Sequence, residues 1–153
     1  ASIADGRAYI GHYGGEMLCV DLETGEIVWR FDTDGEPIFS SPAVHAERVV
    51  FGCRDNRIYC LNQQDGSKLW SFATRGQVDS SPVIARDRVI CGSDDGRLYV
   101  LDLGDGREVA SWDIGEPIGT SPAVSGEAIV IGCEDGFVYG FGPPVSTVEP
   151  LEP

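Results

Sequence analysis

Short runs of alternating apolar and polar residues fill most of the chain, and turn-forming pairs separate them. Asp55-Asn56 and Asp65-Gly66 are two such pairs, and they favour tight hairpins because a central residue of the turn must adopt a positive φ. No segment sustains the 3.6-residue apolar period of a helix. The pattern predicts an all-β chain, with one representative set of strands at residues 38–44, 48–53, 57–61 and 68–72.

This set of strands recurs at a fixed interval. A Ser-Pro step occurs at Ser41, Ser81 and Ser121, and each copy lies 40 residues after the previous one. A period of roughly 40–50 residues is typical of four-stranded propeller blades. The next set is therefore expected at residues 78–84, 89–92, 98–101 and 108–112. We predict blades at about residues 1–37, 38–77, 78–117 and 118–142, and a proline-rich acidic tail or final edge strand at residues 143–153.

The repeat register starts and stops within a blade. Residues 1–3 align with the end of an innermost strand, and the last unit meets prolines where its fourth strand is expected. We therefore expect a β-propeller of about four 40-residue, four-stranded blades that forms a half-ring or a fragment of a wheel of about seven to eight blades. Two copies could close the circle, or residues upstream of Ala1 could supply the other blades. Closure as a four-bladed ring ranks third.

The charge of the chain narrows the range of partners. The 25 acidic side chains outnumber the 11 basic ones, which gives a net charge of −14. A surface of this sign repels phosphate backbones, so nucleic acid is not expected as a partner. No apolar run approaches the ~20 residues of a membrane helix, so no membrane span is expected.

The five cysteines lie in strand-like apolar runs, and no two of them form a Cys-x-x-Cys pair. An odd number at core positions indicates small buried side chains, not disulfides or a zinc site. The compartment is left unassigned: free thiols slightly favour the reducing cytoplasm, and the periplasm is the alternative. The positions are Cys19, Cys53, Cys60, Cys91 and Cys133.

One hairpin of the first unit has a distinctive sequence. Residues 21–29 read Asp-Leu-Glu-Thr-Gly-Glu-Ile-Val-Trp. This segment resembles the D-x-x-T-G-x-x-x-W motif of the pyrroloquinoline-quinone-type (PQQ-like) propeller repeats, a family that includes quinoprotein alcohol dehydrogenases and an outer-membrane assembly lipoprotein. The resemblance covers about residues 1–142.

The other units keep the motif only in part. The second unit has Trp70 at the place of Trp29, whereas the third has Ala110 there. Trp112, two residues further on, points to the same face of its strand. The resemblance implies that Trp29, Trp70 and Trp112 are structural residues whose indoles dock between adjacent blades.

A quinone-dependent enzyme of this family would, as the resemblance implies, have a vicinal cysteine pair, a calcium ion, a base and stacking aromatic side chains. This chain has no adjacent cysteines. The acidic pairs Asp94-Asp95 and Glu134-Asp135 recur in equivalent turns, which indicates a role in the turn and not in a unique metal site. We predict no catalytic residue, no metal site and no cofactor. A fragment of a quinoprotein oxidoreductase stays as an alternative.

The favoured prediction is a non-catalytic propeller that serves as a scaffold for binding proteins or ligands. Propeller loops vary in sequence while the blades stay constant. The loops that lead into the innermost strands differ in sequence from unit to unit, although the strands around them repeat. The expected partner is another protein, or a second copy bound through the terminal blades. A half-propeller that is purely architectural and closes by dimerisation is the other alternative. The candidate contact residues are Glu36, Arg75, Gln77, Asp79 and Glu116.

Overall fold

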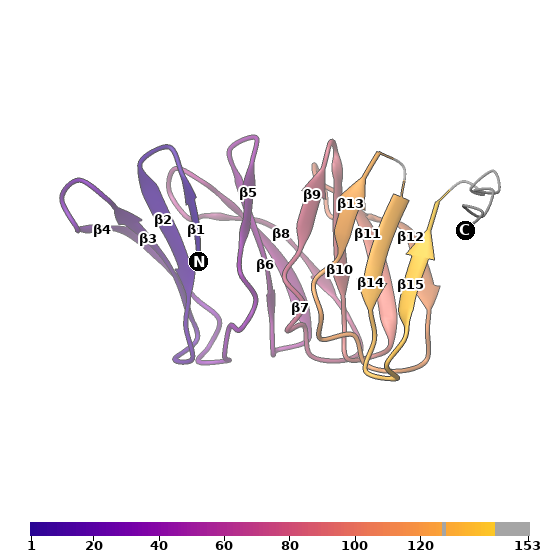
Figure 1. Ribbon diagram of the computed structural model, residues 1–153. Coiled ribbons are helices and arrows are strands. Elements are labelled where there is room, and N and C mark those ends of the chain that lie inside the picture. Colours follow the sequence, from indigo (N-terminus) through magenta and orange to yellow (C-terminus); the bar gives the residue numbers. More distant parts are fainter. Residues whose placement is uncertain (127, 143–153) are drawn as a thin grey trace, which may run out of the picture.

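The computed structural model describes residues 1–126 and 128–142, and the described part is built from β-strands (Figure 1). Within these residues, fifteen strands form three four-stranded sheets and one three-stranded sheet, all antiparallel. Within each sheet the strands are neighbours in chain order. This arrangement confirms the predicted all-β fold. The last predicted segment, residues 143–153, lies outside the described residues.

The first sheet consists of β1 (Ser2–Ala4), β2 (Arg7–Gly11), β3 (Glu16–Asp21) and β4 (Ile27–Asp32), and the second of β5 (Ala43–His45), β6 (Arg48–Cys53), β7 (Arg57–Asn62) and β8 (Lys68–Ala73). The third consists of β9 (Val83–Ala85), β10 (Arg88–Gly92), β11 (Arg97–Asp102) and β12 (Glu108–Asp113). The fourth contains β13 (Ala123–Ser125), β14 (Ala128–Gly132) and β15 (Val138–Phe141). We refer to the sheets as blades 1 to 4.

The innermost strands are shorter than the sequence predicted. Strand β5 covers only the end of the predicted segment 38–44, and β9 only the end of 78–84. The reason is local hydrogen bonding. The Ser40 hydroxyl accepts the N–H of Gly52 at 2.9 Å and donates to its carbonyl at 2.8 Å. The Ser40 side chain thus takes the backbone hydrogen bonds of Gly52 that a longer β5 would use, and Pro42 has no N–H to donate to β6.

The repeated Ser-Pro step connects one blade to the next. The N–H of Ser41 donates to the hydroxyl of Ser81 at 2.8 Å, and the N–H of Ser81 donates to the hydroxyl of Ser121 at 3.2 Å. The innermost strands of successive blades also contact one another. These strands therefore form the hub side of the molecule. The blades stand side by side in an arc that does not close into a ring (Figure 1).

Three hydrophobic clusters lie between successive blades. We call the side of a blade that points to the next blade its trailing face, and the opposite side its leading face. Between blades 2 and 3, the trailing face supplies Val50, Ile58, Cys60 and Trp70, and the leading face supplies Val78, Val89, Cys91, Tyr99, Leu101 and Leu103. The other two junctions repeat this arrangement. The core is thus a set of blade-to-blade contacts.

All five cysteines are buried free thiols, as expected from their positions in the strands. Burial raises the pKa of Cys60 and of Cys91 to about 12. These side chains act as small apolar groups in the clusters. Over the described ranges the chain has no helix that is long and apolar enough to cross a membrane.

Candidate binding surface

The loops that connect one blade to the next lie on the same side of the arc as the hairpins β2–β3, β6–β7, β10–β11 and β14–β15, along the lower edge of Figure 1. We call this side the connecting-loop face. It is built from residues 12–15, 33–42, 54–56, 74–82, 93–96, 114–122 and 133–137. Every residue singled out from the sequence as a partner contact belongs to one of these loops.

Four of the five candidates are exposed there: Glu36, Arg75, Gln77 and Glu116. The N–H of Arg75 donates to the Asp95 carboxylate at 2.8 Å, which fixes the backbone of its loop. The side chains of the four make no hydrogen bond or ion pair with another described residue. The connecting-loop face thus presents three exposed charged side chains and one exposed amide at these positions.

Asp79, the fifth candidate, is half-buried and paired with Arg54. The guanidinium donates from Nε to Asp79 Oδ1 at 2.9 Å and from Nη2 to Oδ2 at 2.6 Å. A bidentate pair of this kind fixes both side chains. The Asp79 carboxylate raises the pKa of Arg54. Arg54 lies in the β6–β7 turn, 25 positions from Asp79, and sequence reasoning missed it.

Two exposed aromatic side chains adjoin this ion pair, and sequence reasoning missed them as well. The Arg54 guanidinium lies over the ring of Phe39, 4.1 Å from its centroid, which is cation–π geometry. Phe39 packs edge-to-face on Tyr13, with 5.6 Å between the ring centroids. Phe39 is 48% exposed and Tyr13 is 74% exposed. Apolar side chains as open as these are rarely grouped without a partner.

Next to these aromatic side chains and Arg54, carboxylates of blades 3 and 4 line the same face. Burial, the Asp79 carboxylate and the Glu134 carboxylate raise the pKa of Asp94, and the Arg54 charge opposes them. Position 119, equivalent to Phe39 and Asp79, is glycine, and a Cβ there would lie 3.7 Å from Glu134 Oε1. We call Tyr13, Phe39, Arg54, Asp79, Asp94 and Glu134 the rim row. It changes from aromatic to acidic along the arc.

The repeat register holds a signal that would have found this row. Position 13 is equivalent to 54, 94 and 134, and the residues there are Tyr, Arg, Asp and Glu. Position 39 is equivalent to 79 and 119, where Phe, Asp and Gly stand. The flanking strands repeat closely, so the change of residue type at these positions stands out. Among residues 1–126 and 128–142, no group of three or more His, Cys, Asp or Glu side chains could hold a metal ion.

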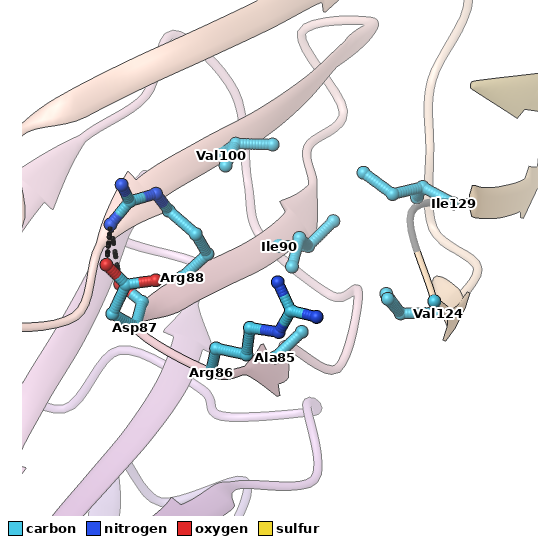
Figure 2. Close-up of a pocket in the computed structure, with 9 residues that line it drawn as sticks. Ala85, Arg86, Asp87, Arg88, Ile90, Val100, Val124 and Ile129 are labelled. Atoms are coloured by element: carbon cyan, nitrogen blue, oxygen red, sulfur yellow. Dashed lines mark hydrogen bonds and ion pairs between the residues drawn. The ribbon is translucent and has the colours of Figure 1, made fainter. Parts of the chain in front are cut away.

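A cavity of about 310 Å³ lies on the opposite side, between blades 3 and 4. Figure 2 shows its apolar lining and the ion pair at its edge, in which Arg88 Nη1 lies 2.7 Å from Asp87 Oδ2. Arg88 also bonds Asp102 at 2.9 Å, so its charge is already compensated. The apolar lining consists of Ala85, Ile90, Val100, Val124 and Ile129.

The predicted structural tryptophans occupy different environments. Trp29 and Trp70 are 7% and 8% exposed, whereas Trp112 is 36% exposed. The Trp70 N–H donates to the Leu103 carbonyl of blade 3 at 3.0 Å. Trp112 instead packs on Phe141 of blade 4, with 4.8 Å between the ring centroids. Ala110, opposite Val100 in the ladder, takes the place of Trp70 at the junction that contains the cavity.

Comparisons with known proteins agree with the repeated four-stranded blades described above. The family model described as outer membrane protein assembly factor BamB matches residues 1–142. A protein of that name from Nitrosomonas eutropha is 34% identical over 67 residues, which are 44% of this chain and 16% of the relative. The chain therefore spans a small part of this relative's length.

Two solved structures share the fold. The crystal structure of BamB from Moraxella catarrhalis superposes with a TM-score of 0.78 at 22% identity, over 90% of this chain and 46% of that one. The computationally designed Ika4 protein superposes with a TM-score of 0.83 at 19% identity, over 92% of this chain and 87% of that one. With its regular blades and a family match over residues 1–142, the chain belongs to the BamB-like family of PQQ-like β-propeller repeats.

Proposed function

We propose that the chain is a non-catalytic scaffold that binds a protein segment on its connecting-loop face. The rim row carries this proposal, because it places two exposed aromatic rings and a fixed arginine beside a group of carboxylates. Aromatic and arginine side chains dominate the binding energy of protein interfaces. The four exposed candidates, Glu36, Arg75, Gln77 and Glu116, would flank the contact as its polar border.

The chemistry of the row specifies the partner. An apolar side chain would pack on Tyr13 and Phe39, and a lysine or arginine would pair with Asp94 and Glu134. The net charge of −14 favours such a basic segment through long-range attraction. The curated relative is named an assembly factor, and binding of a protein client would be in keeping with that name.

The test is a selection of peptides from a random displayed library on the immobilised protein. We expect enriched peptides that combine an aromatic or aliphatic residue with a basic one. Phe39→Ala should weaken their binding at least tenfold. Leu69→Ala is the matched control, because Leu69 is 45% exposed on β8, away from the row. Equal loss in both variants, or no enrichment, would refute the proposal.

A second candidate function, closure of the arc by a second copy, has its own support. Val138 on the trailing face of blade 4 is 72% exposed, whereas the equivalent Ile58 and Leu98 are 0% exposed. Val130 is 43% exposed, and its equivalent Val50 is 0% exposed. The leading face of blade 1 also carries an exposed apolar side chain, Leu22, which is 50% exposed.

Sedimentation equilibrium tests this second candidate. A second copy would bury both terminal faces in a twofold arrangement. We expect a dimer that Val138→Glu converts to a monomer, because the carboxylate would be buried unpaired. Val28→Glu, at a 42% exposed position on the outer strand β4, should leave the dimer intact. A parent protein that stays monomeric at high concentration would exclude closure.

A further inference from the structure

Each of the first three blades has a row of three side chains on its trailing face, one from each of its last three strands. The strand registers pair the members of a row side by side. The rows are Tyr9–Cys19–Trp29, Val50–Cys60–Trp70 and Ile90–Val100–Ala110. The first row has two aromatic rings, whose centroids lie 5.9 Å apart, the second has one, and the third has none.

The cavity between blades 3 and 4 lies against the row that has no ring. Ile90 and Val100 line it from blade 3, and Val124 and Ile129 line it from blade 4. Ile129 is only half-buried, whereas Val89, at the equivalent place in blade 3, is 0% exposed. The cavity of about 310 Å³ thus adjoins the position that aromatic rings occupy at the other two junctions.

One arginine gives this cavity a positive charge. Arg86 and Arg88 both line it. Arg88 is paired with Asp87 and Asp102, whereas Arg86 forms no ion pair with any residue that the structure describes. Figure 2 shows the Arg86 guanidinium turned toward the space beside Ile90, and that of Arg88 turned toward Asp87. A guanidinium placed in this way can hold a carboxylate through two parallel hydrogen bonds.

We propose that this cavity binds a small aromatic molecule with a single carboxylate. The rings lie between Ile90 and Val100 on one side and Ile129 on the other, and the carboxylate pairs with Arg86. One carboxylate is favoured over several because only one cation of the cavity is uncompensated. A further carboxylate would lie near Asp87 without a partner, and its loss of hydration would weaken binding.

This site is independent of the rim row, which lies on the opposite side of the arc. Binding there requires no protein partner, so the two proposals can fail separately. A ligand that binds only the folded protein also stabilises it. The melting temperature should therefore rise with the concentration of the aromatic carboxylate, because the rings add apolar contacts between blades 3 and 4.

The experiment is an NMR titration of ¹⁵N-labelled protein with 2-naphthoate. We expect saturable shifts of the amide signals of Ile90, Val124 and Ile129. The neutral 2-naphthamide has the same rings and should bind about fivefold more weakly, as expected for the loss of an ion pair with an exposed arginine. Octanoate keeps the carboxylate but has no ring. It should also bind about fivefold more weakly, because its flexible chain must be ordered on binding.

Protein variants locate the site. Arg86→Gln should weaken the binding of 2-naphthoate about fivefold and leave that of 2-naphthamide unchanged. Arg75→Gln is the matched control, because Arg75 is exposed on the connecting-loop face. Ile90→Tyr should fill the cavity with the ring that Tyr9 supplies in blade 1, and the shifts of the other lining residues should disappear. Leu69→Tyr, at a 45% exposed position on β8, should leave them unchanged.

Three results would overturn the proposal. The first is the absence of saturable shifts at millimolar 2-naphthoate. The second is equal binding of all three compounds to the parent protein. The third is binding of 2-naphthoate that is unchanged in both Arg86→Gln and Ile90→Tyr. Because the three compounds are compared on the parent protein, the proposal stays testable even where a variant misfolds.

Discussion

The indole N–H of Trp29 donates to the backbone carbonyl of Gln63 at 3.0 Å, across the junction between blades 1 and 2. Trp29 also lies within 5.9 Å of Tyr9, centroid to centroid, and belongs to the hydrophobic cluster of that junction. One side chain thus combines apolar burial with a directed hydrogen bond. Much of the cohesion between these blades should depend on it.

Trp29→Ala should lower the free energy of unfolding by ~3–5 kcal/mol, the usual cost of removing a large buried aromatic side chain. Trp112→Ala should cost clearly less, because Trp112 is 36% exposed whereas Trp29 is 7% exposed. Urea denaturation followed by circular dichroism measures both. Equal costs would show that the junctions do not depend on a buried indole.

The glycines of the outer hairpins allow a matched comparison. Gly66→Ala and Gly25→Ala introduce the same positive-φ strain of about 1–2 kcal/mol. Only in Gly66→Ala does the new methyl group meet a ring, that of Trp29. We expect Gly66→Ala to cost a further 1–3 kcal/mol, roughly that of overpacking a core. If thermal unfolding gives the same loss for both, the contact with Trp29 is not a tight one.

The carboxylates of the rim row should make stability depend on pH. The folded-state pKa of Asp94 is raised, first by burial and then by Asp79 and Glu134. The unfolded chain therefore loses this proton at a lower pH than the folded protein, so stability falls as the pH rises from 3.8 through the folded pKa. Asp94→Asn should raise the melting temperature at pH 7 and have no such benefit below pH 3.8.

Asp135, in the equivalent turn of blade 4, is a control of opposite sign. The Tyr139 hydroxyl, which donates to it at 2.5 Å, lowers its pKa. A lowered pKa contributes stability above the unfolded value of 3.8, which is lost as the pH falls through the folded pKa. Asp135→Asn should therefore lower the melting temperature at pH 7. A gain in stability for both variants would point to net charge and not to local contacts.

Titration calorimetry with pyrroloquinoline quinone and Ca²⁺ should give no saturable heat. The chain has no adjacent cysteines. The cavity between blades 3 and 4 is lined mainly by apolar residues, and of its two arginines, Arg86 and Arg88, the second is already paired with Asp87 and Asp102. Saturable binding with a defined stoichiometry would favour the alternative of a quinoprotein fragment.

Much of the fold could be predicted from the sequence. The alternation at residues 48–53 and the turn pair Asp65-Gly66 each correspond to an element of the structure, because local patterning decides these hairpins. The innermost strands were predicted too long. There, the apolar pattern continues through Ile38, while the Ser40 hydroxyl bonds Gly52 and takes the place of the ladder. Such a competition is decided by tertiary contacts and not by periodicity.

The candidate surface was predicted only in part. Asp79 stood out because it breaks the repeat, but its partner Arg54 comes from a different turn of the preceding blade. The pairing of Tyr13 with Phe39 likewise depends on how the two loops meet at the hub. A comparison of equivalent positions would have flagged these residues, although it could not have shown which of them touch.

The serine bonds between Ser41, Ser81 and Ser121 have a consequence for how such a chain can change length. Each bond joins the same position of neighbouring units, so duplication or loss of a whole unit would keep the pattern of bonds. A loop inside a unit can still change by one residue, because positions 13 and 54 are 41 residues apart while positions 39 and 79 are 40 apart. The serine bonds are therefore compatible with a chain that gains or loses whole repeat units, while the loops within each unit vary in sequence.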